Sequence, residues 1–595
     1  MAETLKKRSE IPEELCWDLT ALFENDTACR EEMARSKQAA IDFAQNYKGK
    51  LEDGDAKLIL SAVKDFENLV RSLNKAGTYV NLRESTDFTD IEAVRLAAEV
   101  RMQLAPIYST VSFFNGELAR AKEESLKEAS EQASEYKIFL DDIRKWQKHL
   151  LDPKTEEVLA SLSPVLFAPM RLYETTKATD MKFPEFKADG EIQPLSYVLY
   201  ENNYCGDTRT ETRREAFRAF SETLRLYRNT TAQNYNTQVQ KEKIMATERG
   251  FDSVIDFLLY GQKVPRELYD RHLDITMEVL GPVMRKWAKL LQKQYNLDEM
   301  RYSDLKLGLD PEYSPQVSVE ESKEYIKKAL APMSKEYQEM VMRAFPERWV
   351  DFAQNIGKST GGFCTSHPDA HPYILLNWNG GLSEVFTLAH ELGHAAQGLL
   401  CDNNNSYMEA EFSWYDVEAP STFHEMLLTH SLLAEAKDER FRRWVLASMI
   451  ENTYYHNFVT HFIEGYYQRE VYRMVDQGQS VSADDLDRIF RETLEKFWGD
   501  AVVLDEGAEL TWMRQPHYYM GLYPYTYSCS LVVSTEMFQR LQKEGESAVK
   551  DWLNFLSTGG PTPPIEHCKV AGIDIEDGSA LKRTLAFIEE IIDQL

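Results

Sequence analysis

The five residues His390-Glu391-Leu392-Gly393-His394 constrain this chain more than any other stretch of its sequence. The two histidines are four positions apart, so on an α-helix both imidazoles lie on one face, one turn apart, where they can share a zinc ion. Glu391 follows the first histidine directly and points to another side of the same turn. Its carboxylate can then reach a water on the metal without being a ligand, which is the division of roles in an H-E-x-x-H site.

The residues around this motif predict a largely buried helix, because most of them are apolar. An alternative interpretation is that both histidines are ordinary core residues with hydrogen-bond partners. A buried helix that carries two imidazoles and a carboxylate needs partners for all three, and a metal ion supplies one for each histidine. The apolar flanking residues are Val385, Phe386, Leu388, Ala389, Leu392, Ala395, Ala396 and Leu399.

Two histidines leave a zinc ion one protein ligand short, because a catalytic site has three protein ligands and one open position. In the extended form of the motif a further histidine would stand at position 400, but this chain has Leu400 there. Our candidate for the third ligand is Glu418, at the start of a predicted helix. Glu425, two turns further on, is expected either to support the site from behind or to be a surface carboxylate. His424 is the competing ligand, although its helical phase differs from that of Glu418.

A second polar constellation lies in residues 517–527, which begin with His517 and contain five tyrosines. Hydrolysis of an amide places negative charge on the carbonyl oxygen, and a phenol or imidazole donor can stabilise that charge. The alternative is an aromatic patch of the core.

Residues 373–378, just before the metal-binding helix, predict a strand. Its edge could pair with an extended peptide and place the scissile bond over the metal, which makes Leu375 and Asn377 predicted substrate contacts. The alternative is a structural hairpin without a role in binding.

Most of the remaining chain has helical periodicity, with apolar residues at spacings of three and four. Exceptions are a short strand pair around an Asp-Gly turn at 183–192 and the strand at 373–378. We therefore expect a mostly α fold, with a small sheet beside the H-E-x-x-H helix. We place an N-terminal helical domain at 1–195 and a catalytic domain at 196–595.

Composition limits the partners. The 595 residues include 97 Asp and Glu against 68 Lys and Arg, a formal net charge of −29 that argues against nucleic acid or an anionic membrane as partner. No apolar run approaches the ~20 residues of a membrane-spanning helix. Residues 1–8 have a basic cluster but no apolar stretch, so no signal peptide is expected. Seven scattered cysteines without a C-x-x-C pair predict reduced thiols in a cytoplasmic protein.

Together these stretches resemble the thimet oligopeptidase (M3) family of zinc metallopeptidases. The resemblance rests on the metal-binding motif, on Val417-Glu418-Ala419-Pro420-Ser421 and on residues 517–527. Residues 17–20 and 373–388 resemble the oligoendopeptidase F branch. The resemblance implies a helical body split by a deep channel, one zinc ion on the channel floor, and endopeptidase action on short peptides. Oligomeric state and cleavage preference are not predicted.

The resemblance also implies roles for single residues. It makes His390, His394 and Glu418 the zinc ligands and Glu391 the general base. Tyr527 matches the tyrosine that stabilises the oxyanion, and His517 matches a histidine that contacts the substrate. Tyr519 and Tyr523 are further candidates for substrate contact, and which of them faces the substrate is left open by the spacing. Two other functions remain: a helical peptide-binding scaffold without turnover, and a zinc exopeptidase that removes dipeptides from one end.

Overall fold

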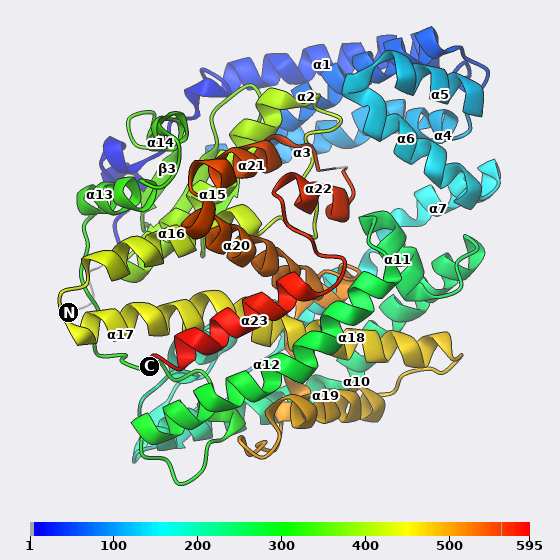
Figure 1. The fold of residues 1–595 in the computed structure, drawn as a ribbon. Coiled ribbons are helices and arrows are strands. Elements are labelled where there is room, and N and C mark those ends of the chain that lie inside the picture. The colour runs from blue at the N-terminus through cyan, green and yellow to red at the C-terminus, as the bar shows by residue number, and fades with distance from the viewer. Residues whose placement is uncertain (1–4, 561) are drawn as a thin grey trace.

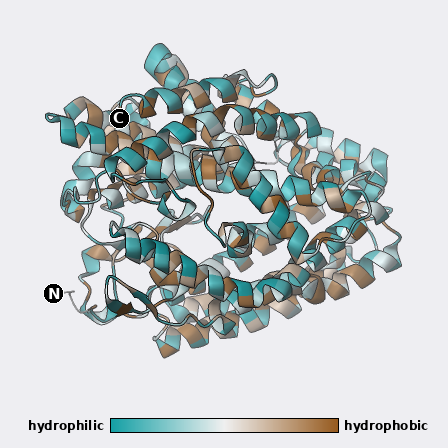
Figure 2. Ribbon diagram, turned by 90° about the horizontal axis from the view of Figure 1, so that it is seen from below, coloured by the Kyte–Doolittle hydropathy of each residue, from teal (hydrophilic) through white to brown (hydrophobic). Residues whose placement is uncertain are grey.

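The computed structural model describes residues 5–560 and 562–595. No signal peptide is expected at residues 1–8, and the first four of these residues lie outside the described part of the chain. The described chain is almost wholly helical with two small sheets, which confirms the predicted mostly α class. Figure 2 shows teal and brown on most helices, as expected for amphipathic helices that bury one side.

The N-terminal part is a layer of antiparallel helices, drawn blue to cyan in Figure 1. Helix α2 illustrates why they form: the Asp55 side chain accepts a hydrogen bond from the Leu58 amide and caps the helix, and Ile59, Val63 and Leu73 form its buried stripe. The helices of this part are α1 (Asp26–Tyr47), α2 (Ala56–Thr86), α3 (Ile91–Val111), α4 (Phe113–Ala119), α5 (Glu123–Gln132), α6 (Lys137–Trp146) and α7 (Pro153–Leu166). The next helix, α8 (Ala168–Thr175), buries Tyr173 in the larger core described below.

A two-stranded hairpin follows, β1 (Phe186–Ala188) with β2 (Glu191–Gln193), and the Asp189-Gly190 turn between its strands has positive φ at both residues. This confirms the predicted strand pair. The helices up to the second sheet are α9 (Tyr197–Leu199), α10 (Thr210–Glu248), α11 (Val254–Gln262), α12 (Arg266–Gln294), α13 (Val319–Ala329) and α14 (Lys335–Met342).

The second sheet has three strands in the order β3-β5-β4, namely β3 (Val350–Ala353), β5 (Tyr373–Trp378) and β4 (Phe363–Thr365). Strand β5 is therefore the central strand, parallel to β3 and antiparallel to β4. The prediction that its edge is free to pair with a peptide is wrong. Leu375 pairs with both neighbouring strands and is fully buried, and the Asn377 amide donates hydrogen bonds to the carbonyls of Ser359 and Gly361.

The rest of the chain builds the larger helical body around the sheet. Its helices are α15 (Leu382–Asn404), α16 (Ala419–Glu435), α17 (Glu439–Ser448), the π-helix η9 (Met449–Thr460), α18 (His461–Asp476), α19 (Ala483–Trp498), the 3-10 turn η11 (Pro516–Tyr519), α20 (Pro524–Glu544), α21 (Glu546–Ser557), α22 (Pro564–Val570) and α23 (Ser579–Ile592). In Figure 1, α15, α16 and α20 lie between the N-terminal layer and a lower layer that contains α12, α18 and α19.

The buried hydrophobic residues form two separate cores. The smaller contains residues from Trp17 to Leu140, and the larger contains residues from Tyr173 to Ile592. Strand β5 lies between the two cores and contributes to both. Tyr373 and Leu375 pack into the smaller core, and the alternate residues Ile374 and Leu376 pack into the larger one. Buried residues between Tyr173 and Leu195 therefore belong to the larger core, although they lie before the predicted domain boundary. The division into domains at residue 195 stays a prediction.

Candidate active site

Helix α15 carries the H-E-x-x-H motif and packs against α16, which begins directly after Glu418. Gly393 makes the close approach of these helices possible. A Cβ atom at this position would lie 2.3 Å from the carbonyl oxygen of Pro420 and 2.7 Å from Cα of Ser421. The glycine inside the motif therefore lets the start of α16 come to within reach of the two histidines.

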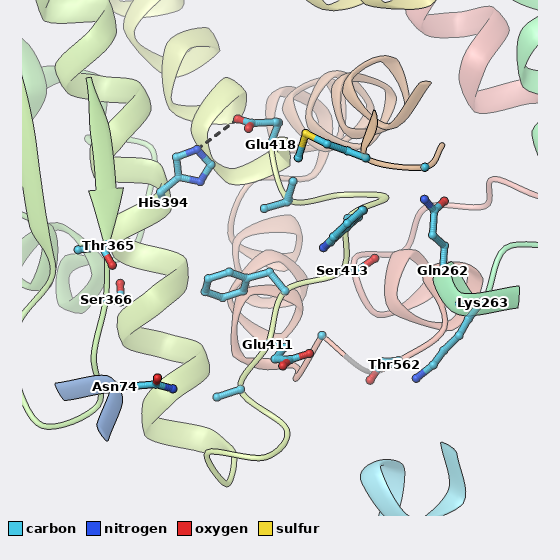
Figure 3. Close-up of a pocket in the computed structure, with 18 of the residues that line it drawn as sticks. Asn74, Gln262, Lys263, Thr365, Ser366, His394, Glu411, Ser413, Glu418 and Thr562 are labelled. Atoms are coloured by element: carbon cyan, nitrogen blue, oxygen red, sulfur yellow. Dashed lines mark ion pairs between the residues drawn. The ribbon is translucent and has the colours of Figure 1, made fainter. Parts of the chain in front are cut away.

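The structure brings the three predicted ligands together. Oε2 of Glu418 lies 3.3 Å from Nε2 of His390 and 3.2 Å from Nε2 of His394, and the contact between His394 and Glu418 is the dashed line in Figure 3. Zinc–ligand distances of about 2.0–2.2 Å in a tetrahedron separate neighbouring donor atoms by about 3.3–3.6 Å. The donor atoms thus have the spacing and the chemical type that a zinc ion needs.

The charge and exposure of these side chains also suit a catalytic metal. The three side chains are 27%, 21% and 18% exposed for His390, His394 and Glu418, so one side of the group is open. Burial raises the pKa of Glu418, but the charge of His394 and hydrogen bonds from both histidines outweigh burial and hold it well below its usual value. A carboxylate must be ionised to bind a metal, and this shift is in that direction.

Glu425 contacts the back of the first histidine. Its Oε1 lies 2.6 Å from Nδ1 of His390, and the Thr453 hydroxyl donates to its other oxygen. A carboxylate in this place holds the ring of a ligating histidine in one tautomer. His424, the competing ligand, points elsewhere, because its Nε2 lies 2.7 Å from the Tyr337 hydroxyl and its Nδ1 lies 3.2 Å from the carbonyl oxygen of Ala389.

Glu391 is 6% exposed and lines the same cavity as the two histidines. Burial raises the pKa of its carboxyl group above the ordinary value, against the lowering effect of the two neighbouring histidines. A carboxylate with a raised pKa is a better proton acceptor near neutral pH than an exposed one.

The three ligands and Glu391 line a cavity of about 1520 Å³ between the two cores. Residues of α2 and α6, such as Asn74 and Asp142, form one wall, and strand β4 with residues 410–418 forms another. Figure 3 shows Asn74 and Glu411 at some distance from the His394–Glu418 pair, with Thr365 and Ser366 along one side. β4 is an outer strand of the sheet and its residues line this wall, whereas none of residues 373–378, the predicted edge strand, lines the cavity.

The tyrosine-rich segment approaches the site from the other side. Tyr519 lines the cavity, whereas Tyr523 packs edge-on against the lining residue Trp414, with ring centroids 5.4 Å apart. His517 and Tyr527 are not among the described residues that line the cavity. Burial raises the pKa of the Tyr527 phenol, and the charges of Tyr523 and Glu418 raise it further. The hydroxyl therefore keeps its proton and can donate a hydrogen bond.

Three ionisable side chains beside this segment were not predicted from the sequence: His461 and Glu464, which are buried, and His456, which is exposed. His461 stacks on the Tyr527 ring at a centroid distance of 4.0 Å, and Glu464 lies beside both His461 and His517. The signal that could have revealed them is the presence of His456, His461 and Glu464 among the aromatic and apolar residues of this helical stretch.

Comparison with known proteins identifies the class. The profile of Peptidase family M3 matches residues 204–587, and that of Oligopeptidase F matches residues 117–183. The chain belongs to Peptidase family M3, and it is therefore a peptidase.

Similar proteins extend over the whole length of the chain. Oligopeptidase PepF of Bacillus subtilis is 28% identical over 601 residues, which cover 100% of this chain and 88% of PepF. Group B oligopeptidase PepB of Streptococcus agalactiae is 27% identical over 595 residues, which cover 99% and 98% of the two chains.

Solved structures share the fold. A candidate peptidase from Chlamydophila abortus has a TM-score of 0.88 at 23% identity, with 100% of this chain and 99% of the other covered. Oligoendopeptidase-F from Enterococcus faecium has a TM-score of 0.71 at 20% identity, with 96% and 97% covered.

Within residues 5–560 and 562–595, no helix combines the length and the apolar character that crossing a membrane requires.

Proposed function

We propose that this peptidase is a zinc-dependent endopeptidase that hydrolyses internal bonds of short oligopeptides. One observation carries the proposal: donor atoms of His390, His394 and Glu418 converge at zinc-ligand spacing on the wall of a large cavity, with Glu391 beside them. The names of the relatives, oligopeptidase and oligoendopeptidase, support the choice of short peptides as substrates.

A zinc ion held by the three ligands would supply the Lewis acid that polarises the scissile carbonyl and acidifies the attacking water. Glu391 takes a proton from that water and passes it to the leaving amine. Tyr527 and His517 stabilise the developing oxyanion, and the Tyr527 hydroxyl does so by donating a hydrogen bond. An extended substrate pairs with the outer edge of strand β4.

The position of the site within the cavity limits the size of the substrates that can reach it. The cavity lies between two cores, with walls from the N-terminal helices and from the larger helical body, so a folded protein cannot bring its backbone to Glu391. A short, flexible peptide can enter and extend along β4. The seven cysteines are all free, which supports the cytoplasm as the compartment.

The first prediction tests the roles of metal and base together. Glu391→Gln should abolish turnover but keep zinc, because the amide cannot accept the proton of the water and the side chain is not a ligand. The assay combines metal analysis with cleavage of a short peptide blocked at both ends. Loss of zinc along with activity would show that Glu391 is misassigned as the base.

The blocked ends separate the remaining candidates. An endopeptidase cleaves a peptide that is capped at both termini, whereas an exopeptidase that removes dipeptides needs one free end. Products from uncapped peptides alone would indicate the exopeptidase, and no products from any peptide, with zinc bound, would indicate a scaffold that binds peptides without cleaving them.

A further inference from the structure

Four ionisable side chains form a cluster beside Tyr527: His461 and Glu464 are buried, His517 is half-buried, and His456 lies on the exposed side. His461 and Glu464 are each 2% exposed. Nδ1 of His461 lies 2.8 Å from Oε2 of Glu464, and Nε2 of His461 lies 3.1 Å from Nε2 of His456. The cluster joins three elements, η9, α18 and η11, and no part of the proposed chemistry has used its carboxylate.

The π-helix η9 explains how the two histidines come together. His456 and His461 are five positions apart, and residues at this spacing diverge on an α-helix. In a π-helix the hydrogen bonds run from residue i to i+5, so this spacing corresponds to one turn. The two rings are accordingly 4.5 Å apart. Local π-helices are costly and occur frequently at functional sites.

Glu464 is a buried anion with room for one more donor. Burial raises its pKa, but the charge of His461, the hydrogen bond from His461 and the charge of His517 lower it to about 2. Oε2 of Glu464 lies 3.6 Å from Nδ1 of His517. This Nδ1 is buried without a hydrogen-bond partner among the described residues, as is the second oxygen of Glu464.

A buried donor and a buried anion at 3.6 Å are one small movement from a hydrogen bond. Hydrogen bonds between catalytic groups are often long before substrate binds and become shorter in the complex. The same carboxylate also holds His461, whose ring lies flat on Tyr527 at an interplanar angle of 19°. Glu464 is thus connected to both proposed oxyanion-binding residues.

We propose that Glu464 is a positioning residue for His517. It accepts the Nδ1–H of His517, fixes the ring in one orientation and one tautomer, and leaves Nε2 as the ring nitrogen that reaches the substrate. Through His461 it also holds the surface on which Tyr527 rests. This inference rests on the proposed function, because it explains how that site is assembled.

The kinetic test is a double-mutant cycle with Glu464→Gln and His517→Phe. We expect Glu464→Gln to lower kcat by about 10- to 100-fold, the usual effect of losing a carboxylate that orients an imidazole. KM should change little, because the group acts through the oxyanion and not on ground-state binding. Since Glu464 acts mainly through His517, Glu464→Gln should slow His517→Phe by much less than it slows the unmodified chain.

Glu451→Gln is the matched control. Glu451 lies on η9, the π-helix that carries His456 and leads into α18, and it accepts a hydrogen bond from the Leu309 amide at 2.6 Å. Its replacement should lower the melting temperature and leave kcat unchanged. A merely structural Glu464 would behave in the same way, with a lower melting temperature and unchanged kcat, and that result would overturn the inference.

A spectroscopic test separates this inference from the proposed function. In protein with ¹⁵N-labelled histidine, His517 is identified by the signal lost in His517→Phe, and its spectrum reports which ring nitrogen carries the proton. We expect Nδ1–H in the unmodified chain and a changed spectrum in Glu464→Met, which has no acceptor. This result holds whether or not the protein cleaves peptides, so absent cleavage would refute only the proposed function.

Two further outcomes would overturn the inference. One is an identical His517 spectrum with and without the Glu464 carboxylate. The other is a second equivalent of zinc, bound by the unmodified chain in excess zinc and lost in Glu464→Gln. His461, Glu464 and His517 have their ligand atoms within 4.8 Å of one another, so that result would make them a metal site instead.

Discussion

Replacing Gly393 by alanine should weaken zinc binding at the proposed site while leaving the fold largely intact. The glycine lies at the closest contact between α15 and α16, the two helices that carry the three proposed ligands. An added Cβ would meet backbone atoms of Pro420 and Ser421, and backbone cannot rotate away as a side chain can.

The required displacement follows from the geometry. The Cβ would lie 2.3 Å from the Pro420 carbonyl oxygen, and real Cβ atoms essentially never approach another atom closer than 3.0 Å. The helices must therefore separate by at least about 0.7 Å, and Glu418, two residues before Pro420, moves with α16. Metal sites tolerate ligand displacements of only about 0.2 Å. We expect the zinc affinity to fall by about 10- to 100-fold, as when a ligand loses the group that orients it.

The cost to the fold is smaller. Inserting a methyl group into a close-packed contact costs about 1–3 kcal/mol, and alanine recovers about 1 kcal/mol through its higher helix propensity. The net destabilisation of about 0–2 kcal/mol leaves the chain folded. Zinc content after dialysis against graded chelator measures the first effect, and a thermal melt of the metal-free protein measures the second.

Gly77→Ala is the control, because Gly77 lies within α2 and an added Cβ there meets nothing within 4 Å. It should keep zinc and gain stability from helix propensity. A Gly393→Ala protein that retains zinc at the same chelator concentration as the unmodified chain would refute the reasoning, since it would show that the close contact at Gly393 does not fix the position of a zinc ligand.

Two further pairs of variants test the remaining roles. Glu418→Ala should lose zinc under mild chelation, whereas Glu425→Ala should lower zinc affinity by only about 10- to 100-fold, because Glu425 orients His390 without being a ligand; stoichiometric zinc in Glu418→Ala would contradict this assignment. Tyr527→Phe should lower kcat by about 10²–10³ with little change in KM, because a donor to the oxyanion acts only in the transition state. Tyr525→Phe is its control: the Tyr525 hydroxyl donates to the Gln262 side chain at 2.7 Å in the core, so its loss should lower the melting temperature and leave kcat near normal. A Tyr527→Phe enzyme with normal kcat would remove this residue from the mechanism.

Local patterns in the sequence were sufficient to predict the helix that carries the H-E-x-x-H motif. The spacing of His390 and His394 determines their common face on any α-helix, whatever the rest of the chain does. Glu418 could be named only because two histidines are too few ligands for zinc, and its contact with them depends on the packing of α15 against α16. The contact of Glu425 with His390 depends on the same packing, so the sequence left open whether it is a support or a surface carboxylate.

The error in the sheet has a physical cause. A strand near a metal helix suggests an edge for substrate, but strand order depends on contacts between distant residues. The signal against an edge was present in Tyr373-Ile374-Leu375-Leu376, which is apolar on both faces, as in strands that are covered on both sides. The outer strand Phe363-Cys364-Thr365 is shorter and less apolar, and it is the strand that lines the cavity.

The cluster around Glu464 shows a different limit. A helical pattern over residues 449–476 is visible from the sequence, but the change from π-helix to α-helix at His461 is not. Only the π-helical form places His456 beside His461, and only the return of the chain at residues 516–519 brings His517 to the same carboxylate. Because burying an ionised carboxylate costs several kcal/mol unless charged or hydrogen-bonded partners compensate it, the fold keeps Glu464 only where those histidines surround it. The dependence on His461 and His517 is therefore mutual, and it ties the stability of this region to the same contacts that position the proposed oxyanion site.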